Sequence, residues 1–253
     1  MTTMDVSITS GLGRAARNLN QCAKAAKTKA APGAMTPLQI EQVVGLGIAC
    51  DWLYWAQSLK SMGYSDRKHS KSSRVYCMQE LTRFTFMWTA ANALFARSSI
   101  IDLLDSTAGS KKGELDRFRV LFQHCGLAGK DVIPFETTLH KLLASEMEVK
   151  HFPWASTTSP PTTLEVIYFK YTVASERTLG VGRKLRQAST TKNYSDLDLP
   201  TLIYATRNWN IHGVLISTSL RGPIKKFNLW IDTINTALAK VLEGAALALQ
   251  KAI

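Results

Sequence analysis

The stretch SRVYCMQELTRFTFMWTAANALFARSSIIDLL (residues 73–104) decides the fold. Its apolar and small residues recur at alternating steps of four and three, at Cys77, Leu81, Phe84, Trp88, Ala91, Phe95 and Ser98. This period places one continuous seam along a single side of an α-helix, where it packs against a partner helix. The stretch therefore predicts a long helix over Ser73–Leu104.

Five other segments have helical periodicity or helix boundary residues. They are PLQIEQVVGLGIACDWLYWAQSLKSM (37–62), Glu114–Cys125, Phe135–Val149, LPTLIYATRNWNIHG (199–213) and the segment from Pro223 to the C-terminus. Prolines open three of these segments, and Gly213 suits a helix C-cap. We expect an all-α helical bundle.

The apolar sides of the two longest of these segments predict their core residues. For residues 37–62 the predicted core side is Ile40, Val43, Val44, Gly47, Cys50 and Tyr54. For the last helix it is Ile224, Phe227, Ile231, Ile234, Leu238, Val241 and Ala245. Trp52, Trp55, Trp88 and Trp230 lie in apolar helical patterns and are also predicted to be core.

The chain divides by pattern into two parts. Residues 1–36 are rich in Ala, Lys, Thr and Gly and end in AAPGAMTP, which predicts a basic N-terminal arm or a loosely packed helix with little core. Residues 37–253 form the predicted helical domain, with an irregular insertion at about 105–200. Within it, TLEVIYFKYTVA (163–174) suits a strand or a helix equally well.

Cysteine usage and hydropathy favour a cytoplasmic protein. Cys22, Cys50, Cys77 and Cys125 form no CxxC pair, and three of them lie in apolar helical patterns, where a thiol acts as a small hydrophobe. The N-terminal segment has no apolar core of a signal peptide, and charge-free runs such as 84–96 are too short to span a bilayer. We expect no membrane partner, no metal and no cofactor.

A net charge of +12 over 253 residues predicts a polyanionic partner, RNA in our interpretation. Residues 6–40 carry Arg14, Arg17, Lys24, Lys27 and Lys29 with no acid, and residues 177–195 carry Arg177, Arg183, Lys184, Arg186 and Lys192 with none. Acid-free basic stretches suit contacts along phosphates. The alternative is that these cations only solvate the surface.

Arg183, Lys184 and Arg186 belong to GVGRKLRQ (180–187), whose glycines let the backbone approach a phosphate. This segment is a candidate for positioning substrate. A merely solvated loop is the alternative, and the pattern does not separate the two.

The segment Arg207-Asn208-Trp209-Asn210-Ile211-His212-Gly213 contains the strongest candidates for chemistry. A histidine, with its unperturbed pKa of about 6.5, suits proton transfer during metal-independent RNA cleavage. A guanidinium suits the charge that develops on the phosphoryl oxygens. Arg207 and His212 are the candidates for these roles, Asn208 for orienting the phosphate or the arginine, and Trp209 for stacking on a base.

Spacing alone leaves a structural interpretation open. Arg207 and His212 lie roughly 140° apart on an ideal helix, so a shared site needs either a frayed helix end or two copies facing each other across a dimer axis. The same spacing occurs in Arg119-Val-Leu-Phe-Gln-His124, where chance explains it. A histidine near a helix C-terminus, followed by a glycine cap, is also an ordinary structural arrangement.

Two stretches resemble the HEPN (higher eukaryotes and prokaryotes nucleotide-binding) superfamily. Tyr204-Ala-Thr-Arg207-Asn208-Trp-Asn-Ile-His212-Gly213 resembles its signature, an arginine and a polar residue followed at a distance by histidine and often glycine. Arg83-Phe84-Thr-Phe-Met-Trp88-Thr-Ala-Ala-Asn92-Ala-Leu94-Phe95 resembles the long early helix of Apea-like members and nominates Asn92 as a further substrate-binding residue. The two stretches bracket about half of the chain.

The resemblance implies an all-helical fold and a metal-independent endoribonuclease whose active site forms at a homodimer interface. It also implies a toxin–antitoxin or phage-defence setting, with an antitoxin or other regulatory partner. The alternative is a non-catalytic, basic helical protein that coats RNA or acts as an adaptor.

Overall fold

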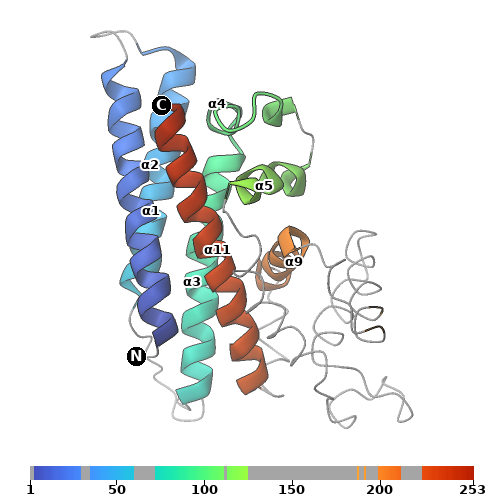
Figure 1. Cartoon of the computed structure of the whole chain (residues 1–253). Coiled ribbons are helices and arrows are strands. Elements are labelled where there is room, and N and C mark those ends of the chain that lie inside the picture. The colour runs from blue at the N-terminus through green and yellow to red at the C-terminus, as the bar shows by residue number, and fades with distance from the viewer. Residues whose placement is uncertain are drawn as a thin grey trace. The chain divides into compact units, whose positions relative to one another are not determined.

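Every regular element in the described part of the computed structural model is a helix (Figure 1). The structure describes residues 3–29, 35–59, 72–110, 113–124, 199–211 and 224–253, together with 187 and 191. The elements are α1 (Thr3–Thr28), α2 (Pro37–Ser58), α3 (Ser72–Phe95), α4 (Ser98–Ile101), the 3₁₀ helix η1 (Ala108–Ser110), α5 (Glu114–Gln123), α9 (Leu199–Ile211) and α11 (Ile224–Ala252). The expected all-α class is confirmed.

The chain forms two compact units, and α3 and α11 contribute to both. One unit comprises Met1–Ser61, Thr82–Leu127 and Asn235–Ile253, and the other comprises Met62–Leu81 and Ala128–Ile234. None of the helices in the described ranges is both long enough and apolar enough to cross a bilayer.

Helix α2 begins where the sequence predicts, at Pro37. The Thr36 hydroxyl accepts a hydrogen bond from the Gln39 backbone N–H at 3.3 Å, and the Thr36 N–H donates to Gln39 Oε1 at 2.9 Å. This capping box satisfies two backbone donors at the start of the helix, and Pro37 lacks the N–H that would otherwise be unpaired there. The beginning of α2 is therefore encoded locally.

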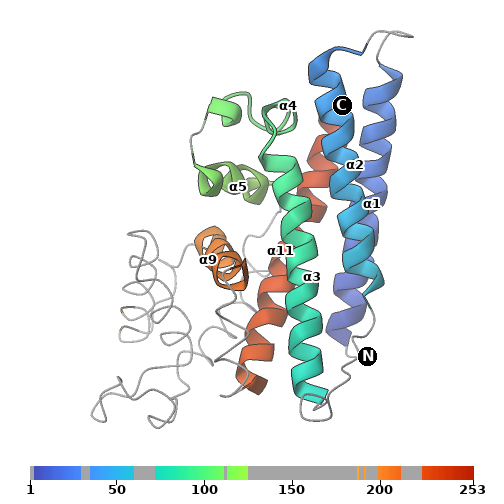
Figure 2. The ribbon, with the colours of Figure 1, turned by 180° about the vertical axis from the view of Figure 1, so that it is seen from behind.

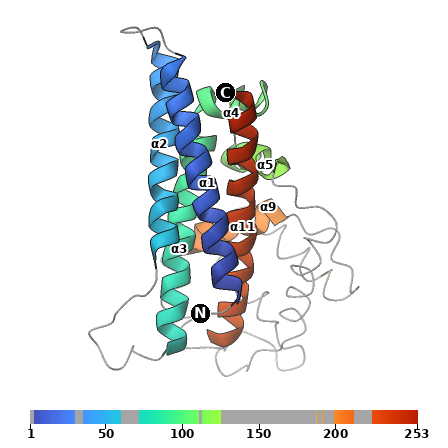
Figure 3. The same ribbon diagram turned by 60° about the vertical axis from the view of Figure 1, so that its left-hand side comes forward.

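The first unit includes α1, which lies between α2 and the C-terminal part of α11 (Figure 3). Its buried hydrophobic residues are Ile8, Leu12, Ala15, Ala16, Leu19, Cys22 and Ala26. Of the two forms expected for residues 1–36, the structure has a helix over Thr3–Thr28, and the expectation that it contributes little core is wrong. Small residues make close packing possible here: a Cβ on Gly13 would lie 2.7 Å from Gln57 Nε2.

The buried side of α2 differs from the predicted one. It is formed by Gly45, Leu46, Ala49, Cys50, Leu53 and Ala56. Ile40, Val44 and Tyr54 are exposed, and Trp55, predicted to be core, has 65% of its surface exposed. The helix is apolar on nearly all sides, so its periodicity does not identify the side that packs.

The expected helix over Ser73–Leu104 is wrong beyond Phe95. The backbone of Arg97 is extended (φ −99°, ψ 118°), and α4 begins at Ser98. On an uninterrupted helix Ile100 would lie about 200° from Ser98, opposite the apolar seam. The bend instead buries Ile100 completely.

The predicted seam is buried from Cys77 to Phe95, whereas Ser98 at its end is exposed. The ring centroid of Trp88 lies 5.7 Å from that of Phe95 and 5.0 Å from that of Phe118 on α5. Figure 2 shows α5 beside the C-terminal end of α3. Trp88 is buried, as predicted, and Trp52 is half-buried with its ring centroid 5.3 Å from that of Phe86.

The second unit contains all of α9, together with the first turns of α3 and the first part of α11. Leu202 and Ile203 on α9 are buried, as are Trp230 and Ile231 on α11. The Tyr76 hydroxyl donates a hydrogen bond to Asp232 Oδ1 at 2.8 Å, which links α3 to α11 within this unit. The expected helices near Pro200 and Pro223 are confirmed as α9 and α11.

Candidate nucleic-acid interface

One side of α1 presents cations to solvent. Arg17, Lys24 and Lys27 are exposed and fall within about 80° of one another around the helix. Buried Leu19 lies on the opposite side, about 200° from Arg17. The three residues extend over about 15 Å of the helix axis. We call Arg17, Lys24 and Lys27 the basic face of α1.

These three cations are available to a ligand. Within the described residues, no ion pair or hydrogen bond engages the side chain of any of them. Double-stranded DNA carries a phosphate about every 3.4 Å along each strand, and on this scale 15 Å spans several phosphates of a nucleic-acid backbone. The spacing of the basic face therefore suits contacts to successive phosphates.

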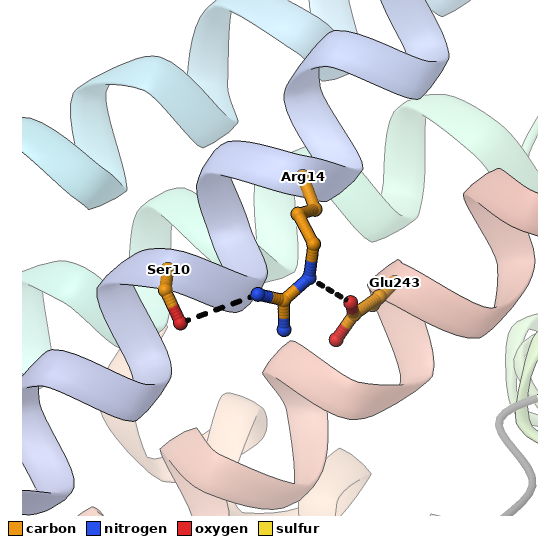
Figure 4. A network of polar contacts seen from close by, with 3 residues as sticks. All are labelled: Ser10, Arg14 and Glu243. Atoms are coloured by element: carbon orange, nitrogen blue, oxygen red, sulfur yellow. Dashed lines mark hydrogen bonds and ion pairs between the residues drawn. The ribbon is translucent and has the colours of Figure 1, made fainter.

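Arg14 lies on the same helix, but an acid neutralises it. Its Nε donates to Glu243 Oε1 on α11 at 2.6 Å, and its Nη1 donates to Ser10 Oγ at 3.5 Å (Figure 4). The hydrogen bond that Arg14 donates to Glu243 and the charge of that carboxylate raise the pKa of Arg14. The sequence stretch is acid-free, yet the fold brings an acid to it from 229 positions away.

Other arginines of the same unit hold the protein's own backbone. Arg83, predicted only as part of the α3 motif, is buried and donates to the carbonyl oxygens of Ala56 and Leu59 at 2.7 and 2.9 Å. Arg117 donates to the carbonyls of Ala96 and Gly109 at 3.1 and 2.8 Å. Formal charge therefore overstates the cation available to a ligand.

Arg207, the arginine of the candidate catalytic motif, lies in α9 and is half-buried. Its guanidinium carbon is 5.6 Å from the centroid of the Tyr204 ring, one turn earlier in the same helix. A guanidinium at this distance from an aromatic face is attracted to it, so the ring restrains Arg207. The Nε atom of Arg207 is buried.

The partners expected for Arg207 are not all described. Asn208 and Trp209 belong to α9, but their side chains lie outside the described residues, as does His212. Arg183, Lys184 and Arg186 also lie outside them. The convergence of Arg207, Asn208 and His212 on one phosphate therefore stays a prediction.

Asn92 lies in α3 and is half-buried, in the unit that does not contain Arg207. Its backbone carbonyl accepts from the Ala96 N–H at 2.9 Å, close to the end of the helix. Its role in binding substrate stays a prediction. Among the described residues, no group of three or more His, Cys, Asp or Glu side chains is placed to hold a metal ion.

Known proteins give no further guide to this surface. Comparison with protein families, with curated proteins and with solved structures finds no match. The assignment of function therefore rests on the chemistry of the described residues.

Proposed function

We propose that this protein binds RNA through the basic face of α1. The observation that carries the proposal is the exposure of Arg17, Lys24 and Lys27 on one side of a helix whose other side is packed in the core. A packed helix holds its cations at a fixed spacing, so the protein loses little conformational entropy on binding. Such contacts bind phosphates and carry little base specificity.

The proposal is tested by salt-dependent RNA binding. The triple variant Arg17→Gln/Lys24→Gln/Lys27→Gln removes three cations from exposed positions, so helical content should be unchanged. Fluorescence anisotropy with a single-stranded RNA should show weaker binding, and the slope of log K against log salt should fall by about two. The slope separates phosphate contacts from a general loss of folding.

A matched control removes charge elsewhere. Arg119 is half-exposed on α5, and Lys251 is exposed in the last turn of α11. Arg119→Gln/Lys251→Gln should change the slope by much less than Arg17→Gln/Lys24→Gln, although both variants lose two charges. Equal loss in the two double variants would show that only net charge matters and would remove the basic face from the proposal.

A second candidate function is metal-independent RNA cleavage of the HEPN type, with Arg207, Asn208 and His212 acting at a homodimer interface in the cytoplasm. The restraint of Arg207 by Tyr204 favours it, because a guanidinium held in place stabilises developing phosphoryl charge without first being ordered. In this case the setting is toxin–antitoxin or phage defence, and an antitoxin or regulator is a partner.

Cleavage is tested by incubating the pure protein with total RNA, with and without a chelator. Arg207→Ala and His212→Ala should each abolish strand scission in either condition while leaving RNA binding through α1 intact. Scission that persists in either variant removes that residue from the mechanism. Binding without scission by the unmodified protein leaves the first proposal standing and eliminates the second.

A further inference from the structure

The outer side of α2 carries large apolar side chains that are open to solvent. The exposed fractions are 49% for Ile40, 48% for Val44, 40% for Tyr54 and 65% for Trp55. Gly47 and Asp51 lie among them, and all six residues fall within about 100° around the helix. We call these six residues the outer face of α2. Helix α2 itself lies at the edge of its bundle in Figure 3.

The size of the outer face matches the apolar part of a protein interface. Its four large side chains expose on the order of 400 Å². Each partner in a standard interface buries about 800 Å², of which a little over half is apolar. The largest apolar patch on a monomeric protein is typically about 300–600 Å² and is often a functional surface.

Two large apolar residues of the outer face, Ile40 and Tyr54, lie symmetrically about Gly47. Ile40 and Tyr54 lie seven residues before and after it, and a Cβ added at Gly47 would meet no atom within 4 Å. A two-fold axis through Gly47 would place Ile40 of one copy against Tyr54 of the other and let the helices approach closely where there is no side chain. Self-complementarity of this kind is the requirement of a two-fold interface.

Charge also favours a second copy at this face. Helix α2 contains Glu41 and Asp51 and no lysine or arginine, in a chain with a net charge of +12. Two copies of so basic a protein repel each other least where cations are absent. We propose that the outer face of α2 joins two copies of this chain in an antiparallel pair centred on Gly47, independently of RNA binding.

Sedimentation velocity of the full chain from about 1 to 100 µM tests the proposal. Trp55→Glu introduces a charge at the most exposed position of the face, so the fold is retained and the dimer dissociation constant should rise at least 30-fold. Leu247→Glu is the matched control, because Leu247 on α11 is also an exposed apolar residue, at 46%, outside this face. It should leave the constant within about threefold of the original.

A second variant should change association in the opposite direction. Asp51 loses water when the faces meet, so Asp51→Asn should tighten the dimer roughly threefold to tenfold. Monomeric unmodified protein at about 100 µM would overturn the proposal, and so would equal weakening by Trp55→Glu and Leu247→Glu. Because no RNA is present, a monomer that still binds RNA overturns the dimer and leaves RNA binding through the basic face of α1 standing.

Discussion

Arg14 and Glu243 join the first and last long helices of the chain through an ion pair of 2.6 Å. Seven residues further along both helices, Gln250 Nε2 donates to Gln21 Oε1 at 2.8 Å, with the same sequence separation of 229. The constant separation shows that α1 and α11 run parallel in this region. The pair marks the register of α1 against α11 and withdraws one cation from the surface that we propose for RNA.

Glu243→Gln should release Arg14 to the basic face. Arg14 is half-exposed, so the pair contributes less than about 1 kcal/mol to stability, and the variant should unfold at nearly the same urea concentration. RNA affinity should rise modestly, with a salt slope steeper by about one. Arg14→Gln is the control, since it cannot strengthen binding. Unchanged RNA affinity in Glu243→Gln would place Arg14 outside the contact.

Arg83→Met should destabilise the fold much more than loss of a surface arginine. The buried Arg83 guanidinium donates to the carbonyls of Ala56 and Leu59 at the end of α2, and the variant leaves those oxygens without these donors. We expect a loss of about 2–4 kcal/mol in the free energy of unfolding in urea. Arg119→Met, at a half-exposed site, should cost under about 1 kcal/mol. Similar losses in both would show that the Arg83 contacts contribute little.

Helix positions were predictable where the signal is local. The start of α2 is determined within four residues, by the capping box of Thr36 and Gln39 and by Pro37. The break after Phe95 depends instead on Ile100, which packs against Gly45 of another helix. The hydrophobic periodicity of residues 73–104 contains no information about this contact with another helix.

The candidate sites also divide into features that a local sequence pattern predicts and features that depend on tertiary contacts. The exposure of Arg17, Lys24 and Lys27 follows from the period of α1, whereas the neutralisation of Arg14 depends on a distant acid. Residue types in 207–213 predict a chemistry, but whether those side chains meet depends on tertiary structure.

Gly45 and Gly47 should respond oppositely to alanine. A Cβ at Gly45 would lie 2.5 Å from Ile100 Cδ1 and 2.6 Å from Arg97 Cδ, and Ile100 is fully buried. The resulting overpacking should cost about 1–3 kcal/mol, more than the helix propensity gained. At Gly47 the space is open, so alanine should stabilise the helix by about 0.5–1 kcal/mol. Thermal unfolding in a Trp55→Glu background measures both changes without self-association. Destabilisation by Gly47→Ala would contradict the open space.

The buried thiols should be inert in the folded protein. Desolvation raises the pKa of Cys77 to about 12 and that of Cys22 to about 11, and it also raises the pKa of Cys50. Because the thiolate is the nucleophile, these three cysteines should react with a disulfide reagent at pH 8 only after unfolding. Cys125, outside the described residues, is replaced by serine in this experiment. Rapid reaction of the folded Cys125→Ser protein would contradict the burial.

The same shifts predict a loss of stability at alkaline pH. The unfolded thiol ionises near its ordinary pKa of 9.0, whereas the folded Cys77 thiol stays protonated until about pH 12. Above pH 9 the unfolded state therefore releases the proton first, and Cys77 alone should lower stability by up to about 1.4 kcal/mol per pH unit until the folded thiol also ionises. Cys22 and Cys50 add to this slope, because their pKa values are raised as well. Urea unfolding at pH 8, 9.5 and 10.5 measures the slope. Cys77→Ala removes the titrating group, so its stability should decline less steeply over the same range, and equal slopes would exclude Cys77 as a source of the effect.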